Sequence, residues 1–167
     1  METVVSALII IGILILVVFS AAFYMLNTQA AISDSSRVMQ ARMTDRARTG
    51  MTLVSTVTDA PGDYAQIILQ NTGMVKQSDL KNWDVIVQYT DALGGFHAGW
   101  YTYPVSWTAQ IYQTLPSQLE TIEPGILNPG EYLAFQIHLV PPAKTGTTNL
   151  ATITTPNGVT LETIFSH

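Results

Sequence analysis

An uninterrupted apolar run near the N-terminus constrains this chain more than any other feature of its sequence. Residues 4–26 read VVSALIIIGILILVVFSAAFYML, and no charged residue lies between Thr3 and Ser33. As an α-helix, these 23 residues would be about 35 Å long at about 1.5 Å per residue, which is enough to cross the hydrocarbon core of a bilayer. The run therefore predicts a membrane-resident helix, and a plain single-span anchor is its simplest interpretation.

The residues on either side of the run argue against a secretory signal peptide. Such a peptide begins with a basic segment, has an apolar stretch of about 7–15 residues and ends in a small-residue cleavage site. Here the only charged residue before the run is the acidic Glu2, and the first basic residue is Arg37, which follows the run. Because basic residues normally mark the cytoplasmic side of a span, the arginines alone would place the C-terminal part in the cytoplasm. A short basic leader, removed next to the apolar run, would resolve this conflict, and we expect one upstream of Met1.

The predicted helix continues beyond the apolar run to about Thr49. Residues 27–48 contain no proline or glycine, and apolar side chains recur at helical spacing. The whole helix would be on the order of 70 Å long, more than twice the bilayer core, so its second half needs another environment. The charges on this half form either a solvated face or ion pairs between neighbouring subunits. They belong to Asp34, Arg37, Arg42, Asp45, Arg46 and Arg48.

From residue 50 the apolar period changes from helical to alternating, and Thr, Val, Ile, Tyr and Trp become frequent, as in β-strands. Turn sequences rich in Gly, Pro and Asn separate the alternating runs, and Asn157-Gly158 is the strongest hairpin signal. This spacing predicts an antiparallel, immunoglobulin-like β-sandwich. The fold class is then α+β, with a helical segment at 1–49 and a sandwich at 50–167. We predict strands at 52–58, 64–71, 83–90, 96–107, 132–140, 147–155 and 159–165, with a short one near 119–122.

Composition and residue types exclude several classes of function. A formal net charge of −5 provides no basic face for nucleic acid, and the absence of cysteine excludes disulfides and metal–thiolate sites. The three histidines, His97, His138 and His167, are not at metal-ligand spacing, and residues 59–63 are expected to be a plain turn rather than a calcium loop. We therefore expect no catalytic residue, no cofactor and no metal, with His138 on the outward face of its strand.

The most aromatic stretch is WYTYPVSW at residues 100–107. Tyr101, Tyr103, Val105 and Trp107 alternate along it and are expected on the core face of one strand. Trp100 would then point outward. Its side chain belongs either to incidental packing under a loop or to a subunit contact or glycan-binding patch, since exposed aromatic surface is typical of interfaces.

Three patterns in the β region, in this order behind such a helix, resemble the archaellins, the archaeal flagellins. They are IILQNTG at 67–73 with WDV at 83–85, LNPGEYL at 127–133, and TPNGV at 155–159. The resemblance covers essentially the whole chain and extends to the wider class of type IV pilins. Val5 stands where pilins proper carry a glutamate, so the chain is more similar to archaellins than to pilins.

The resemblance implies a helical homopolymer in which the N-terminal helices bundle into the core and the β domains form the outer surface. It also implies that a prepilin-type peptidase removes a basic leader, that the chain is inserted in the cytoplasmic membrane before assembly, and that an assembly and motor platform receives it. The expected function is a structural subunit of an archaellum-like extracellular filament for swimming. The residues expected in the filament core are Val4, Val5, Leu8, Ile9, Ile11, Gly12, Ile13, Leu16, Val17, Phe19, Phe23 and Leu26. Contacts between subunits are expected at Glu2, Asp34, Arg37, Arg42, Asp45, Arg46 and Trp100.

Two other functions remain open at this point. The chain is alternatively an accessory, stator-like protein of the same machinery, in which a single span presents a β domain to the envelope, or an adhesive pilus subunit. The helix distinguishes the accessory protein from a filament subunit. An anchor needs only one span, whereas a filament subunit uses additional helix for contacts with its neighbours.

Overall fold

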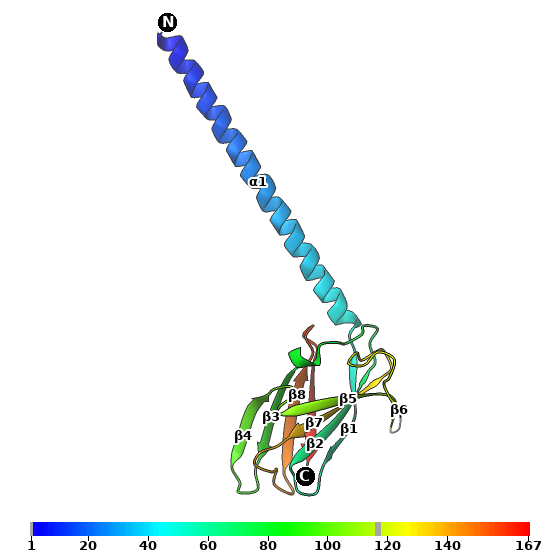
Figure 1. The fold of residues 1–167 in the computed structure, drawn as a ribbon. Helices are drawn as coiled ribbons and strands as arrows, with labels where there is room; N and C mark the ends of the chain where they lie inside the picture. Colours follow the sequence, from blue (N-terminus) through cyan, green and yellow to red (C-terminus); the bar gives the residue numbers. More distant parts are fainter. Residues whose placement is uncertain (1, 116–117) are drawn as a thin grey trace. The chain divides into compact units, whose positions relative to one another are not determined.

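The computed structural model describes residues 2–115 and 118–167, with side chains from residue 6 onward. In these residues one α-helix, α1 (Glu2–Arg48), precedes a set of β-strands (Figure 1). The chain divides into two compact units, Met1–Met43 and Thr44–His167, and each is described by itself.

Helix α1 runs without interruption for 47 residues, as predicted. Two hydroxyl side chains of the helix bond to its own backbone, since Ser20 Oγ donates to the carbonyl oxygen of Leu16 (2.8 Å) and Thr28 Oγ1 to that of Tyr24 (2.9 Å). These two hydroxyl protons therefore do not require water. The stretch Ser6–Arg48 is long and apolar enough to cross a membrane, with a mean hydropathy of 2.8 in its most apolar window, and none of that window is buried.

The second unit is an antiparallel β-sandwich of two sheets. A five-stranded sheet has the order β1-β2-β7-β5-β6, and a four-stranded sheet has the order β4-β3-β8-β9. The two sheets meet along one side, where Thr56 Oγ1 of β1 donates to the carbonyl oxygen of Ile164 in β9 (3.3 Å). The strands are β1 (Met51–Thr58), β2 (Tyr64–Asn71), β3 (Asp84–Thr90), β4 (Phe96–Tyr101), β5 (Trp107–Thr114), β6 (Gln118–Leu119), β7 (Tyr132–His138), β8 (Thr148–Thr154) and β9 (Thr160–Ser166). A short 3-10 helix, η1 (Leu80–Asn82), precedes β3.

The core lies between the two sheets, because alternate residues of each strand face inward. On β2, for example, Ala65, Ile67 and Leu69 are fully buried, while the residues between them lie on the outer face. An aromatic cluster fills the centre. The ring of Phe135 lies 5.7 Å from that of Trp83 and 5.0 Å from that of Trp107.

The predicted strand at 96–107 is wrong in one respect, since it is two strands of different sheets. β4 ends at Tyr101, and β5 begins at Trp107 after a turn closed by the hydrogen bond from Ser106 N to the carbonyl oxygen of Thr102 (2.8 Å). Pro104 lies in this turn and has no N–H to offer a sheet. Tyr103 and Val105 are therefore not core residues but 36% and 81% exposed, and β5 was not predicted beyond its first residue.

The remaining predicted strands are confirmed, each to within two residues at either end, except that the short strand near 119–122 is only Gln118–Leu119. The Asn157-Gly158 hairpin between β8 and β9 is also confirmed. Gly158 has a φ of 83°, a conformation that favours glycine, and its N–H donates to the carbonyl oxygen of Thr155 (2.8 Å). The turn at 59–63 is held by Asp59, whose carboxylate accepts the N–H of Tyr64 (2.9 Å).

Candidate assembly site

The apolar surface of α1 has no cover within its own unit. Nine of the side chains predicted for a filament core are more than half exposed in the single chain, namely Leu8, Ile9, Ile11, Ile13, Leu16, Val17, Phe19, Phe23 and Leu26. Burying one such side chain contributes about 1.5–3 kcal/mol, so the nine together represent on the order of 20 kcal/mol that only a membrane or other chains can supply. The side chains of Glu2, Val4 and Val5 lie outside the described residues.

The apolar half of α1 offers the same chemistry on every side, because no charged residue interrupts it from Thr3 to Ser33. A helix that is hydrophobic all round is one that is buried all round, in a bilayer or among other helices. Gly12 is the only glycine in α1, and a Cβ added there would meet nothing within 4 Å. Within this chain, therefore, no close contact requires a glycine at position 12.

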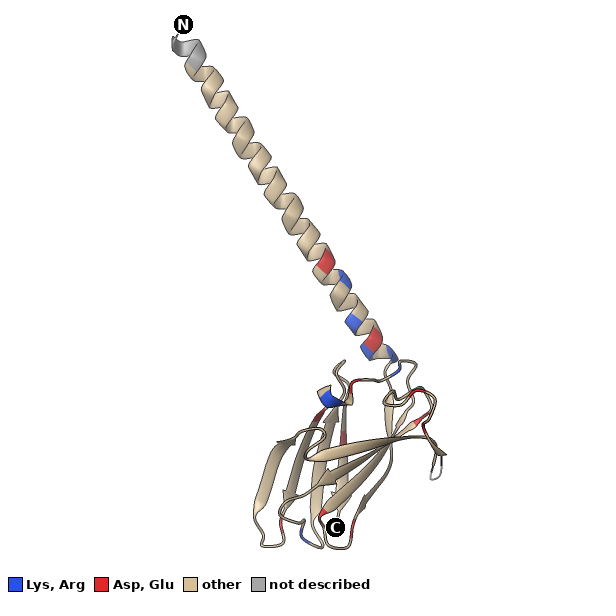
Figure 2. Ribbon diagram, viewed as in Figure 1, with Lys and Arg blue, Asp and Glu red and all other residues tan. Residues whose placement is uncertain are grey.

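The charged half of α1 is exposed and carries all four arginines of the chain (Figure 2). Within the described residues, no ion pair involves Asp34, Asp45 or these arginines. The sandwich, by contrast, contains three lysines and nine acidic residues, a formal charge of −6. Opposite charges of this kind favour contacts between a basic helix segment and an acidic sandwich when copies of the chain associate.

The last turn of α1 belongs to the sandwich unit and is fixed to it by hydrogen bonds around Thr49. The hydroxyl of Thr49 donates to the carbonyl oxygen of Asp45 (2.8 Å) and accepts from Gln77 Nε2 (3.3 Å) and from Asn157 Nδ2. The carbonyl oxygen of Arg48 accepts the N–H of Met74 (2.8 Å). We call residues 48–50 and the groups bound to them the junction.

Asn71 connects the other side of the junction and is fully buried. Its Nδ2 donates to the carbonyl oxygens of Val75 (3.0 Å) and Leu127 (3.1 Å), and its Oδ1 accepts the N–H of Gly73 (3.1 Å). Gly73 packs directly on the backbone of residues 48–50. The three sequence patterns at 67–73, 127–133 and 155–159 are thus brought together at the junction, which sequence spacing alone did not reveal.

Trp100 points outward, as predicted, and is 64% exposed. Its Nε1 donates to the carboxylate of Asp84 (3.2 Å), and it pairs with Ile86 across β3 and β4. His138 also lies on an outward face and is exposed. No group of three His, Cys, Asp or Glu side chains in the described part of the chain is placed to hold a metal ion.

The β3–β4 hairpin contains a carboxylate with three hydrogen-bond partners, that of Asp91. Asp91 Oδ1 accepts the N–H groups of Leu93 (2.9 Å) and Gly95 (2.8 Å), and Oδ2 lies 2.7 Å from His97 Nε2. The hydrogen bond with His97, followed by that from Gly95, lowers the pKa of the Asp91 carboxyl below its ordinary value. The imidazole of His97 also stacks on Tyr89, with ring centroids 5.1 Å apart.

We expect the Asp91 carboxylate to lose its stabilising effect on the folded sandwich at low pH. Because the pKa of Asp91 is lower in the folded chain than in the unfolded chain, its stabilising effect is present above the unfolded pKa of about 3.9 and is lost as pH falls through the folded value. Asp91→Asn should therefore melt at a lower temperature than wild type at pH 6, and this difference should shrink as pH falls from about 4 toward 2. Asp63→Asn is the control, because the Asp63 side chain forms no hydrogen bond with the described residues. A constant difference between Asp91→Asn and wild type from pH 6 to pH 2 would contradict the assignment.

An uncovered apolar helix joined through a hydrogen-bonded junction to a β-sandwich defines a class of structural proteins that act by association. Within this class, the chain belongs to the archaeal-type flagellin family, whose family model matches residues 2–165. Members of this family are structural filament proteins, and the chain is a homopolymer-forming subunit of that kind. No curated protein sequence matches the chain.

Solved structures share the fold, among them the following three. The archaeal flagellum of Methanospirillum hungatei strain JF1 is 16% identical, with a TM-score of 0.60 over 97% of this chain and 92% of that chain. The archaellum periplasmic stator protein FlaG from Sulfolobus acidocaldarius is 22% identical, with a TM-score of 0.50 over 70% of this chain and 99% of that chain. The stator complex of FlaF and FlaG from the same organism is 21% identical, with a TM-score of 0.51 over 69% of this chain and 87% of that chain.

Proposed function

We propose that this chain is the polymerising subunit of an archaellum-like cell-surface filament for swimming. Residues 1–49 form the membrane-resident segment and then the filament core, and residues 50–167 form the outer domain. The observation that carries this proposal is the helix itself. Its length of about 70 Å at about 1.5 Å per residue exceeds what a single membrane span requires, and apolar side chains beyond the span are uncovered too, namely Ile32, Val38, Met39 and Met43.

The accessory, stator-like function is the second candidate, because two stator structures share the sandwich fold. Those likenesses cover 69% and 70% of this chain, whereas the likeness to the flagellum covers 97%. The additional coverage favours the filament subunit over the accessory protein.

Assembly then begins in the cytoplasmic membrane, where the charge-free half of α1 matches the thickness of the hydrocarbon core. A prepilin-type peptidase and an assembly and motor platform are the expected partners before incorporation, as in the proteins that the sequence resembles. In the filament, the residues from Val4 to Leu26 named above for the core contact the helices of other subunits. Asp34, Arg37, Arg42, Asp45 and Arg46 lie at the boundary between the helices and the acidic sandwiches, and Trp100 contacts a neighbouring sandwich.

The abundance of the chain at the cell surface tests this proposal. A filament subunit should be the main protein in material sheared from cells, present in large excess over motor components by quantitative mass spectrometry. An accessory protein should instead stay with the membrane fraction at low copy number. Recovery of the chain only from membranes would reject the filament function and favour the stator-like one.

We expect Gly12→Leu to reduce filament yield strongly, while Gly12→Ala is tolerated better. Glycine permits close approach of helices in apolar surroundings, and the site has space for a Cβ within the single chain, so any clash must come from another subunit. The measurement is the mass of pelletable filaments per cell after shearing, with the membrane content of each variant as the control for expression. Equal yields from the two variants would show that Gly12 has no packing role.

A further inference from the structure

The five-stranded sheet has no charged residue in any of its strands. β1, β2, β5, β6 and β7 contain no Asp, Glu, Lys or Arg, although such residues make up about a quarter of typical soluble sequences. Charged side chains are a common means of preventing exposed sheets from associating. The strands of the four-stranded sheet carry two, Asp84 and Glu162. The outer face of the five-stranded sheet is therefore suited to contact with something uncharged.

Amide and hydroxyl side chains occupy the middle of this outer face. Gln66, Gln136 and Thr108 lie side by side across β2, β7 and β5, and all three are exposed. None of their side chains forms a hydrogen bond with the part of the chain that the structure describes. Two residues beyond Thr108 on β5, Gln110 Oε1 accepts a hydrogen bond from Tyr112 Oη (2.7 Å). The NH₂ group of Gln110 forms no hydrogen bond with the described residues. The row thus presents unused donors and acceptors in a fixed register.

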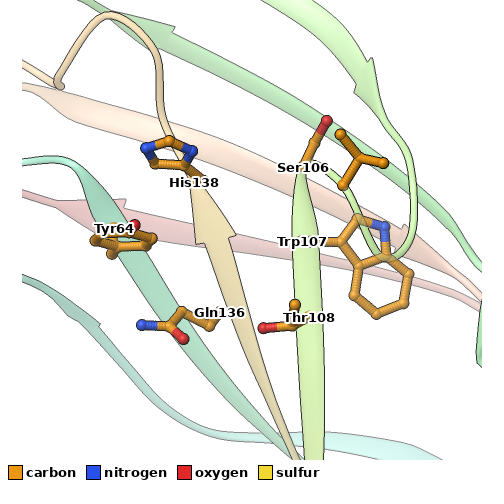
Figure 3. A pocket seen from close by; sticks show the side chains of 7 residues that line it. Tyr64, Ser106, Trp107, Thr108, Gln136 and His138 are labelled. Carbon is orange, nitrogen blue, oxygen red and sulfur yellow. The ribbon is translucent and has the colours of Figure 1, made fainter.

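Two stacked rings lie beside this row, two residues along β2 and β7 from Gln66 and Gln136. The phenol of Tyr64 and the imidazole of His138 lie 4.8 Å apart with an angle of 17° between their planes. Figure 3 shows this pair beside Gln136 and Thr108, with the indole of Trp107 directed away from them. Tyr64 is 39% exposed, so part of its ring remains available to a ligand.

Two adjoining hollows lie over the row and the rings. A hollow of about 380 Å³ lies over Gln66, Thr108, Gln110 and Gln136, and one of about 240 Å³ lies at Tyr64 and His138. The two share Thr108 and Gln136 in their walls. From residue 134 to residue 138, β7 covers about 13 Å at about 3.3 Å per residue. The hollows therefore form an open trough that is longer than a single sugar ring.

We propose that this trough binds a neutral polysaccharide chain. Sugar hydroxyls both donate and accept, as do the carboxamides of Gln66 and Gln136 and the hydroxyl of Thr108. The apolar C–H face of a pyranose fits against an aromatic ring such as Tyr64, which is apolar on its face and polar at its tip. An acidic sugar would find no cation in these strands. Cleavage of a glycosidic bond normally uses two carboxylates, and these strands contain none, so the trough holds a glycan without hydrolysing it.

This binding activity goes beyond filament formation and does not depend on it, since every residue of the trough belongs to the sandwich. The test uses the full-length chain in a polyoxyethylene detergent, because a sugar-headed detergent would compete for the trough. The purified chain is passed over immobilised dextran, amylose, cellulose, mannan and galactan, with the acidic polysaccharide alginate for comparison. We expect retention on at least one of the five neutral polysaccharides and none on alginate.

Two substitutions in the trough test whether the retention on the polysaccharide depends on it. Gln136→Ala and Tyr64→Ala should each weaken binding at least tenfold, since each removes a direct contact at an exposed position. Gln88→Ala is the matched control, because Gln88 lies on β3, on the outer face of the other sheet. The affinity of this variant for the polysaccharide should stay within twofold of that of wild type. Intrinsic fluorescence of the buried Trp83 and Trp107 verifies that each variant is folded.

Several outcomes would overturn the proposal. They are no retention on any of the five neutral polysaccharides, retention on alginate alone, or equal retention of wild type and both trough variants. A loss of filament yield in Gln136→Ala and Tyr64→Ala with unchanged polysaccharide binding would assign the face to a contact between subunits instead.

Discussion

Ile13→Lys is expected to abolish filaments while the sandwich stays folded. Ile13 lies deep in the charge-free part of α1, is 60% exposed in the single chain, and has no acidic residue near it in sequence. A lysine at the centre of a membrane span costs about 2.5–3.5 kcal/mol on insertion scales, which so apolar a span absorbs. In the filament, every subunit would bring an unpaired ammonium into a core of identical helices. Insertion should therefore survive the change, and assembly should not.

The measurement is the yield of pelletable filaments after shearing, together with the amount of the variant in membranes. Ile13→Leu controls for the change of side chain, and Val105→Lys controls for an added lysine, since Val105 is on the exposed turn between β4 and β5. Both controls should assemble. If Ile13→Lys gave a normal filament yield, α1 would not form a buried core, and the single-span anchor would be the better account.

Gly73→Val is expected to have the largest effect on the stability of the sandwich. A Cβ at Gly73 would meet the backbone nitrogen of Gly50 and lie 2.6 Å from the carbonyl oxygen of Arg48. Because these are backbone atoms of the junction, no side chain can move aside to relieve the contact. Overpacking of this kind costs about 3 kcal/mol at the upper end of its usual range. For a domain of this size such a loss corresponds to a fall in melting temperature of roughly 10 °C or more.

Thermal unfolding of the full-length chain in detergent, followed by the fluorescence of Trp83 and Trp107, measures this change. Gly99→Val is the control, because the atom nearest to a Cβ at Gly99 is Tyr101 Cε2 at 3.9 Å. Its melting temperature should stay close to that of wild type. If Gly73→Val melted like Gly99→Val, the junction would be more deformable than the packing of residues 48–50 indicates.

Most of the fold was predictable because its signals are local. The length of α1 follows from an apolar run and a helix-compatible continuation, and the β8–β9 hairpin follows from Asn157-Gly158. The error at 96–107 has a physical cause, since a run of alternating aromatic residues does not reveal that the chain changes sheets within it. Pro104 was the available signal, because a proline inside an alternating run argues against one continuous strand. The alternation of Trp107 and Ile111, both buried, would then have indicated β5.

The candidate site was predictable only in part. The apolar side chains of α1 are conspicuous in sequence because they occupy every side of a helix. The junction was not predictable, since Asn71, Gly73 and Asn157 reach residues 48–50 only through the pairing of distant strands. The trough was missed for the same reason. Gln66, Thr108 and Gln136 are ordinary polar residues of three separate strands, and only the register of β2, β7 and β5 places them in one row.

The arrangement of charge links these parts of the molecule. All four arginines lie on α1, all three lysines lie on the sandwich, and nine of the twelve acidic residues also lie there. Within one chain, the charged half of α1 has no ion-pair partner among the described residues. Copies of the chain can satisfy both the charged half and the apolar half of α1 by packing together, because each copy brings an acidic sandwich and an identical apolar helix.

Cryo-electron microscopy of filaments sheared from cells that produce this chain tests the central claim most directly. The density should contain this sequence, with residues 4–26 of every subunit packed against the helices of other subunits along the filament axis and the sandwiches on the outside. Filaments built from a different chain, with this one recovered only from the membrane fraction, would contradict a polymerising role for α1.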